Sequence, residues 1–354
     1  MVRGDHGQSM VRGDHGISLS PLKAGLPWAS GILSCRQSKP WRLSLETTRA
    51  WLKEFATEDS MGVISKSGNS IAEISQKELA SNFEEGWAKF PIYFFPEGDE
   101  QRTKLLAATN VFIFLFDDFW EMHDVTSFSQ IQEVFVARMQ IGKNLPDDPK
   151  STLHSLIDDM TAEILDLDRN NGNDSGREML DEMVRFFGRP PPPEKYNNME
   201  DFLLYRHEDA AIHIRYVLAC TKFSLNSCLD LDSSRLVTYI RLFKDQVSVA
   251  NDLASWEKEK KAYDAGKVMY MINTVDVVKQ LFNLATFDTA VAMTQAFQFQ
   301  IECDIDDKIQ QLVTEDDLTA DEWRFIDATL HVMSGNTFTS TVMSRYGGES
   351  YRLE

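Results

Sequence analysis

Cysteine is scarce in this sequence, with four residues among 354. No two of them form a C-x-x-C pair, and none has a histidine at metal-binding spacing. The sequence therefore lacks the patterns of a disulfide framework and of a zinc site. We expect reduced thiols in a cytoplasmic protein at all four positions, which are Cys35, Cys220, Cys228 and Cys303.

Long apolar runs and an excess of positive charge are missing as well. The run at residues 111–116 is too short to cross a bilayer, which takes roughly 20 residues in a helix. No signal-peptide core stands at the N-terminus. The formal net charge of −19 argues against nucleic acid and anionic membranes as partners. We therefore expect a protein without membrane insertion and without nucleic-acid binding.

The first 40 residues differ in composition from the rest. Residues 1–7 (MVRGDHG) recur verbatim as residues 10–16, and the stretch through residue 40 is rich in Gly, Ser and Pro. We expect a tag-like or disordered arm over residues 1–40. From residue 41 onward apolar residues recur at spacings of three and four, and alternation with period two is rare. This pattern predicts a single all-α domain over residues 41–354.

An oxygen-rich stripe lies inside a helical run that begins near residue 233. Asn251, Ser255 and Glu259 are four residues apart, so on a helix they drift by roughly 80° over about 12 Å. An amide, a hydroxyl and a carboxylate are hard oxygen ligands of the kind that Mg²⁺ shares with substrate phosphates. Lys258 adds a cation for the same phosphates. A polar stripe facing solvent is the alternative interpretation.

The string N-D-x-x-S-x-x-K-E around this stripe favours the metal interpretation. Its five specified residues would occur by chance in such a chain on the order of once in ten thousand. The string resembles the second metal-binding motif of class I terpene cyclases, the family that ionises prenyl diphosphates and folds the carbocation into rings. This resemblance implies a closed helical bundle of the class I terpenoid synthase type. It also implies three further signatures elsewhere in the chain.

Two adjacent carboxylates follow the apolar run described above. Asp117 and Asp118 end a predicted buried helix, and Glu121 stands one turn after Asp117. Adjacent carboxylates at such a place repel each other and cost desolvation unless a cation neutralises them. The pattern resembles the first metal motif of the same family. Similar acidic clusters at residues 158–163 and 316–321 have polar surroundings, and we interpret them as solvated helix faces or caps.

Arg206, Asp209 and Ala210 lie at i, i+3 and i+4 of another predicted helix. By itself this spacing is compatible with a surface ion pair, which contributes little to stability. Arg206 stands 45 residues before Asn251, about where the family has an arginine that senses the substrate diphosphate. The resemblance implies a linker acid at Asp209 and an effector residue at Ala210. A guanidinium suits the sensing task because it binds phosphate oxygens through two N–H groups.

Arg345 and Tyr346 resemble the family's terminal Arg-Tyr pair, which grips the diphosphate as the site closes. The arginine stands 94 residues beyond Asn251. Many relatives have an aromatic residue six positions before this arginine, whereas here Thr339 stands there, beside Phe338. By helical spacing from the metal motifs, we expect the pocket to be lined by Ile113, Phe114, Val247 and Phe338.

Together the signatures imply a carbon–oxygen lyase acting on phosphates, of the fungal or bacterial single-domain type. By the resemblance, a cluster of three Mg²⁺ ions ionises farnesyl diphosphate, and the cation cyclises to a sesquiterpene with release of pyrophosphate. A diterpene cyclase using geranylgeranyl diphosphate is the first alternative. A chain-elongating prenyltransferase is disfavoured, because that class has aspartate-rich motifs on both helices. A non-catalytic helical protein is the remaining alternative, and a homodimer stays open.

The acidic cluster at residue 158 offers a first test of the metal assignment. We expect Asp158→Asn combined with Asp159→Asn to retain most pyrophosphate release, because solvated carboxylates hold no metal. Asp117→Asn should lower release by orders of magnitude while the helical circular dichroism stays unchanged. Pyrophosphate release from farnesyl diphosphate measures both proteins. An inactive double variant beside an active Asp117→Asn protein would show that the wrong pair was chosen.

Overall fold

The computed structural model describes most of the chain. The described residues are 15–19, 35–57, 70–121, 135–140, 151–188, 192–209, 214–268 and 270–342. For residues 16–19, 117–121, 209 and 341–342 the backbone is described and the side chains are not.

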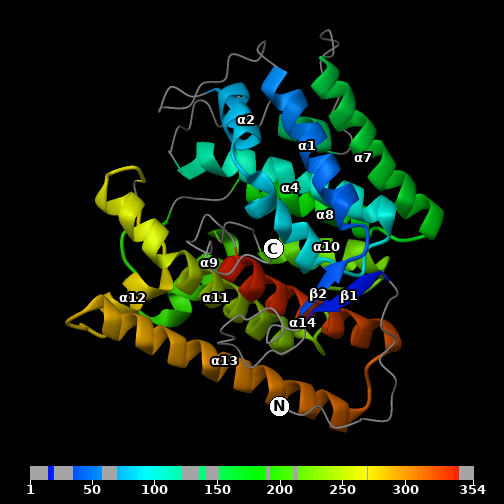
Figure 1. Ribbon diagram of the computed structural model, residues 1–354. Coiled ribbons are helices and arrows are strands. Elements are labelled where there is room, and N and C mark those ends of the chain that lie inside the picture. Colours follow the sequence, from blue (N-terminus) through cyan, green and yellow to red (C-terminus); the bar gives the residue numbers. More distant parts are fainter. Residues whose placement is uncertain are drawn as a thin grey trace.

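The described chain is almost entirely helical, as the sequence predicted, and its helices surround one large apolar core (Figure 1). In chain order the α-helices are α1 Trp41–Thr57, α2 Ile71–Ala80, α3 Phe90–Phe94, α4 Glu100–Glu121, α6 Ala137–Met139, α7 Thr152–Asn171, α8 Ser175–Phe186, α9 Met199–Asp209, α10 Ile214–Leu225, α11 Val237–Asp264, α12 Thr274–Leu281, α13 Phe287–Glu315 and α14 Ala320–Val342. Short 3₁₀ helices occupy Phe83–Glu85 and Trp87–Lys89. The strands are β1 Gly16–Leu19 and β2 Cys35–Ser38.

Helices α11 and α14 lie side by side and run in the same direction, with α13 packed along the outside of α11 (Figure 1). The Tyr239 hydroxyl of α11 contacts Thr329 Oγ1 of α14 at 2.7 Å. One step further along both helices, Asn336 Nδ2 donates to the Val247 carbonyl at 3.2 Å. Because residue numbers increase in the same direction between the two contacts, the helices are parallel and their C-terminal ends lie at the same end of the molecule.

Helix α10 contacts both α4 and α14 and runs opposite to them. The Tyr216 hydroxyl of α10 donates to Thr109 Oγ1 of α4 at 2.8 Å. Arg102, earlier on α4, instead donates to Asn226, just after α10, at 2.9 Å. Near the start of α14, Arg324 reaches the carbonyl of the last α10 residue. The C-terminal ends of α4, α11 and α14 therefore lie at one end of the bundle, together with the start of α10.

The core is densely aromatic around α4. Phe112 and Phe116 are fully buried, and their rings meet the Phe55 ring edge-on at centroid distances of 5.3 and 6.0 Å. Such edge-to-face pairs contribute about 0.5–1.5 kcal/mol each beyond their burial. Elsewhere on α4, Phe114 stacks on Trp87 at 5.0 Å. This apolar part of α4 is thus packed on more than one side, as its composition predicted.

A small sheet departs from the predicted helical pattern. β1 and β2 pair antiparallel, β2 packs against α3 and α14, and Arg36 forms a buried ion pair with Glu97. Residues 35–40 therefore belong to the folded body, although the sequence predicted a disordered arm there. Four-residue strands are too short for alternation to be recognised. Residues 1–14 and 20–34 lie outside the described residues, so the arm stays a prediction for them.

All four cysteines are free, with Cys35 and Cys220 buried and the other two exposed. Burial raises the pKa of the Cys35 thiol to about 12 and that of the Cys220 thiol further still, so both stay protonated and unreactive. Among the described helices, none is both long and apolar enough to cross a bilayer.

Helix α14 approaches α3 closely at Gly335. A Cβ atom at this position would collide with the backbone carbonyl of Tyr93. One turn further on, the Phe338 ring packs on the Tyr93 ring at a centroid distance of 4.9 Å. The lack of a side chain at Gly335 therefore sets the spacing between these two helices.

We expect Gly335→Ala to destabilise the fold by about 1–3 kcal/mol, because overpacking a close helix contact forces the backbones apart. Gly188→Ala is the matched control, since its Cβ would lie 3.5 Å from the Arg185 carbonyl, an ordinary contact. Thermal melting of both variants beside the unaltered chain measures the difference. Equal melting temperatures for the two variants would contradict the close approach at Gly335.

Candidate active site

A buried ion pair joins α9 to α11. Arg206 of α9 directs Nε and Nη2 at Asp252 Oδ1, at 3.0 and 2.6 Å, and the two side chains are 4% and 0% exposed. Removing one partner of such a pair leaves a buried charge uncompensated. Since Asp252 directly follows Asn251, this contact brings the predicted diphosphate sensor beside the predicted metal stripe.

The second oxygen of the Asp252 carboxylate is held from α12. Thr274 donates to Asp252 Oδ2 through its backbone N–H at 2.8 Å and through its hydroxyl at 2.6 Å. Asn273 Nδ2 donates to the Asp252 carbonyl and to Glu259 Oε2, both at 2.9 Å. One carboxylate thus connects α9, α11 and the start of α12.

The predicted metal ligands on α11 share one face of the helix. Asn251 is half-buried, while Ser255 is fully buried and its hydroxyl has no hydrogen-bond partner among the described residues. Burial, and then the nearby Asp252 carboxylate, raise the pKa of Glu259 above its ordinary value. A divalent cation would favour the charged carboxylate and would give the Ser255 hydroxyl a partner. The donor set on α11 therefore fits a hard cation such as Mg²⁺.

The predicted metal ligands of α4 lie at the same end of the bundle as the predicted metal ligands of α11. Asp117, Asp118 and Glu121 occupy the C-terminal end of α4, and only their backbone is described. That end lies beside the start of α10, which follows the helix of Arg206. In the described part of the chain, no three side chains of His, Cys, Asp and Glu gather as a metal site. The candidate ligands on α11 are an amide, a hydroxyl and one carboxylate, so they are not a group of this kind.

Helix α14 brings its C-terminal end to the same region. The contact of Asn336 with Val247 lies one turn before Asn251, and α14 continues six residues beyond Asn336. The distance along the chain from there to the predicted Arg-Tyr pair is short. Outside the described residues are Ala210, Arg345, Tyr346 and the side chain of Asp209. Their predicted roles stay predictions.

The predicted pocket-lining residues have different surroundings. Ile113 and Val247 are buried, and Phe114 is half-buried and stacked on two aromatic rings. Phe338 is buried against α3. Thr339, at the position where many relatives have an aromatic ring, is fully buried and its hydroxyl has no partner among the described residues. An aromatic residue is therefore missing from this position of α14, and the neighbouring Phe338 packs on Tyr93 of α3.

A cavity of about 460 Å³ opens at the opposite end of the bundle, lined in part by Glu97, Arg102 and Arg324. Arg102 lies 15 residues before Asp117 on α4, which is about 22 Å along a helix axis. Its charge is already paired, since Nη1 lies 2.5 Å from Asp99. This cavity is therefore separate from the candidate active site.

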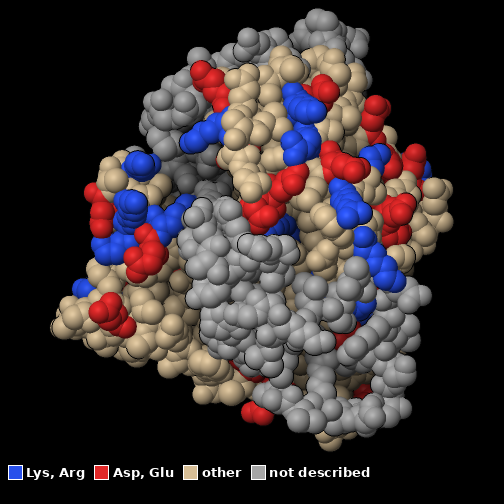
Figure 2. Space-filling view, in the orientation of Figure 1, with Lys and Arg blue, Asp and Glu red and all other residues tan. Residues whose placement is uncertain are grey.

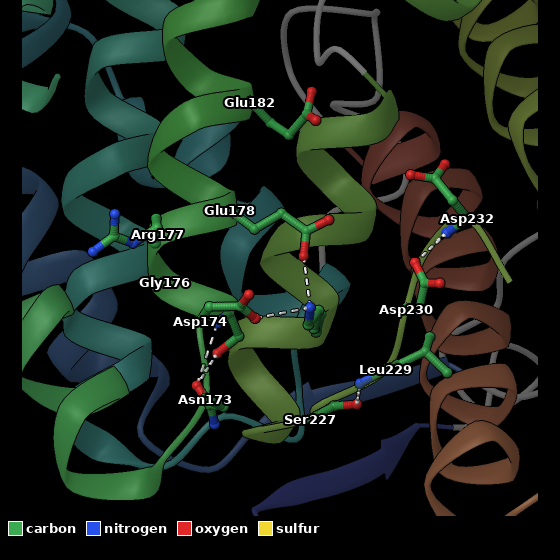
Figure 3. Close-up of polar contacts among 12 residues, drawn as sticks. Asn173, Asp174, Gly176, Arg177, Glu178, Glu182, Ser227, Leu229, Asp230 and Asp232 are labelled. Carbon is green, nitrogen blue, oxygen red and sulfur yellow. Dashed lines mark hydrogen bonds and ion pairs between the residues drawn. The ribbon is translucent and has the colours of Figure 1, made fainter. Parts of the chain in front are cut away.

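A further group of acids lies on α8 and in the loop after α10 (Figure 3), and several of them pair with Lys222 or Arg215. The buried Lys222 places Nζ 2.6 Å from Glu178. Arg215 joins Glu182 to Asp232 at 2.9 and 2.7 Å. These carboxylates form ion pairs between helices and loop, so a metal is not needed to account for them.

The acidic clusters interpreted as solvated also have structural partners. Asp158 accepts two contacts from Arg138, at 3.1 and 3.2 Å, and Asp159 is exposed. Asp321 accepts a hydrogen bond from the Ser227 hydroxyl at 2.6 Å, near the start of α14. For Asp158 the prediction of a solvated carboxylate was therefore wrong, because it pairs with the buried Arg138. Asp321 lies in the first turn of α14, as expected of an acid near a helix start.

The arrangement of helices is that of known enzymes. The chain is similar to a single-substitution variant of cucumene synthase, with 14% identity and a TM-score of 0.65 over 90% of this chain and 99% of the other. It is similar to aristolochene synthase from Penicillium roqueforti, with 16% identity and a TM-score of 0.64 over 84% and 94%. For a-eudesmol synthase the values are 13% and 0.59, over 86% and 96%. The fold is therefore the all-α fold of class I terpene synthases.

The sequence itself identifies the family. Residues 108–297 match terpene synthase family 2, C-terminal metal binding. The match covers more than half of the chain and contains the acids of α4, Arg206 and the stripe on α11. The chain belongs to terpene synthase family 2, and its matching domain is of the metal-binding kind. None of the curated proteins matches the chain.

Three residues of the site were missed from the sequence. Asp252 lies inside the metal motif, but the spacing of the motif predicted metal binding by Asn251 and Ser255 and gave Asp252 no role. Asn273 and Thr274 begin α12, where Asn273 caps the helix by accepting from the Val275 N–H at 2.9 Å. An asparagine before a helical run signals a helix start. That signal does not predict which residues accept hydrogen bonds from the NH₂ group of the asparagine.

Neutralising the carboxylate of the buried pair should destabilise the fold strongly. We expect Asp252→Asn to lower the free energy of unfolding by about 3–5 kcal/mol, because Arg206 keeps its charge in a place that water does not reach. Asp232→Asn is the control: its ion pair with Arg215 is largely exposed, at 70% for the Asp232 side chain, and should contribute under about 1 kcal/mol. Urea unfolding of both variants measures the contrast, and similar losses would contradict it.

Proposed function

We propose that this chain uses Mg²⁺ to ionise farnesyl diphosphate, cyclises the cation to a sesquiterpene and releases pyrophosphate, as a carbon–oxygen lyase acting on phosphates. The observation that carries the proposal is the buried hydroxyl of Ser255, which has no hydrogen-bond partner among the described residues. It lies between Asn251 and Glu259 and one turn from the Arg206–Asp252 pair. Family membership supports a prenyl diphosphate substrate. The similar folds include those of sesquiterpene synthases, which favours a substrate of fifteen carbons.

The residues that would hold the metal come from two helices that end together. They are Asn251, Ser255 and Glu259 on α11 and Asp117 on α4, with Asp118 and Glu121 as further candidates. A cluster of three Mg²⁺ ions would supply the positive charge that stabilises a departing diphosphate. The chain contributes oxygen donors on fixed helix faces, so the ligands need little rearrangement when the metal binds.

Arg206 would bind the diphosphate from the side of α9. Asp252 orients its Nε and Nη2, which holds the plane of the guanidinium and balances its charge. Lysines and acids alternate at the C-terminal end of α11, and blue and red side chains lie together at the left of Figure 2. Lys258, half-buried and next to Glu259, would add a cation for the diphosphate. Arg345 and Tyr346 would add donors as the site closes.

Movement of the diphosphate-binding groups would pass along α9. In this proposal Asp209 is the linker acid that holds Arg206 and transmits its movement to the effector residue Ala210. The pocket wall would then exclude water from the cation through Ile113 and Val247. Aromatic faces such as Phe114 stabilise a cation through the ring quadrupole.

Substrate preference and the alternatives are tested in one assay. We expect Mg²⁺-dependent pyrophosphate release that is faster with farnesyl than with geranylgeranyl diphosphate, and a sesquiterpene in the extracted products by mass spectrometry. Chelation of divalent cations should abolish the release. Faster turnover of geranylgeranyl diphosphate would make the chain a diterpene cyclase, longer linear diphosphates would make it a prenyltransferase, and no release would leave a non-catalytic protein.

Variants on α11 connect this activity to the site. Asn251→Leu should lower turnover by orders of magnitude with unchanged helical circular dichroism, because the metal loses an oxygen ligand. Glu257→Gln is the matched control, an exposed position on the same helix. Near-normal turnover of Asn251→Leu would exclude the α11 stripe as a metal site.

A further inference from the structure

Both polar atoms of the Asn273 side chain form hydrogen bonds. Its Oδ1 accepts from the Val275 N–H at 2.9 Å and so caps α12. Its Nδ2 donates to the Asp252 carbonyl and to Glu259 Oε2, each at 2.9 Å. The side chain is fully buried. Both protons of the amide group therefore have acceptors on α11.

The helix cap fixes which way this amide points. A backbone N–H can only donate, so the atom facing Val275 must be the amide oxygen, and the NH₂ group must face α11. The capping contact thus presents the donor side of Asn273 to Glu259. A carboxylate that receives a fixed donor on one oxygen has its plane held and its other oxygen directed elsewhere.

Thr274 extends the same contact to Arg206. Its N–H and its hydroxyl occupy Asp252 Oδ2, while Arg206 occupies Oδ1. Two consecutive residues at the start of α12 therefore hold both carboxylates, that of Asp252 beside the arginine and that of Glu259 on the metal stripe. These carboxylates are like charges, and the donors of Asn273 and Thr274 reduce their mutual repulsion.

We propose that Asn273 and Thr274 are positioning residues of the active site, which orient Glu259 for the metal and hold Asp252 against Arg206. This inference rests on the proposed function, because it concerns the same metal and diphosphate. It assigns a task in the reaction to the start of α12, a segment outside both metal motifs. Neither residue touches the substrate in this account, since each acts through a carboxylate of α11.

Substitution of Asn273 by serine separates capping from positioning. Serine caps helices about as well as asparagine, so Asn273→Ser keeps the start of α12 and removes the amide donors. Without ligand we expect a slightly lower melting temperature than that of the unaltered chain, because two buried acceptors on α11 lose their donor. The apparent affinity for Mg²⁺, measured as the shift in melting temperature with Mg²⁺ titrated at constant pyrophosphate, should fall about 10–100-fold. The Mg²⁺ concentration for half-maximal turnover should rise by the same factor.

A cap elsewhere is the matched control. Ser151 caps α7 by accepting from the His154 N–H at 3.1 Å, away from α11 and α12. Ser151→Ala should lower the melting temperature slightly and leave the Mg²⁺ dependence unchanged. An unchanged Mg²⁺ dependence in Asn273→Ser as well would overturn the proposal, because the amide contacts would then be structural only.

Thr274 gives an independent second pair of variants, which decides the matter if Asn273→Ser fails to fold. Thr274→Val removes the hydroxyl donor to Asp252 and keeps the shape of the side chain, whereas Thr274→Ser keeps the donor. We expect a smaller melting shift with Mg²⁺ and pyrophosphate in the valine variant and a normal shift in the serine variant. Equal shifts in both would overturn the proposal. Absence of any shift in the unaltered chain would instead refute the proposed function, and with it this inference.

Discussion

The buried contact between Arg206 and Asp252 is the interaction on which the candidate active site depends. Moving two charges out of water costs several kcal/mol for each ion, so such a pair is tolerated only where hydrogen bonds satisfy the remaining polar atoms. Thr274 supplies them, with donor distances of 2.6 and 2.8 Å to the second carboxylate oxygen. Helices α9, α11 and α12 are therefore held in one arrangement. A shift of α9 or α11 by one turn would separate the two charges, and a shift of α12 would remove the donors to Asp252.

The packing of the other helices determines where in the bundle the Arg206–Asp252 contact lies. The aromatic packing of α4 and the parallel course of α11 and α14 bring three helix ends together at one end of the molecule. The opposite end contains ordinary ion pairs, such as that of Lys222 with Glu178. The Ser255 hydroxyl, buried and without a hydrogen-bond partner among the described residues, lies at the site end.

Local patterns in the sequence were sufficient for the helices and for the family. The spacing of Asn251, Ser255 and Glu259 predicted one helix face, and α11 runs through all three. The apolar run before Asp117 predicted a central helix, and Phe112 and Phe116 are fully buried. The two short strands could not be predicted in this way. β2 packs against α3 and α14, and a strand of four residues is too short to show a periodic pattern.

The sequence by itself determined which side chains share a face, because helical periodicity is a property of neighbours along the chain. It therefore predicted the all-α class and the oxygen-rich stripe on α11. Only the tertiary structure decided that Asp252 turns to Arg206 and that Asn273 turns to Glu259, since these partners are 46 and 14 residues apart and lie on different helices. The physical reason is that a buried charge pairs with whichever opposite charge or donor the packing of helices brings within about 3 Å, and that packing is settled by the core as a whole.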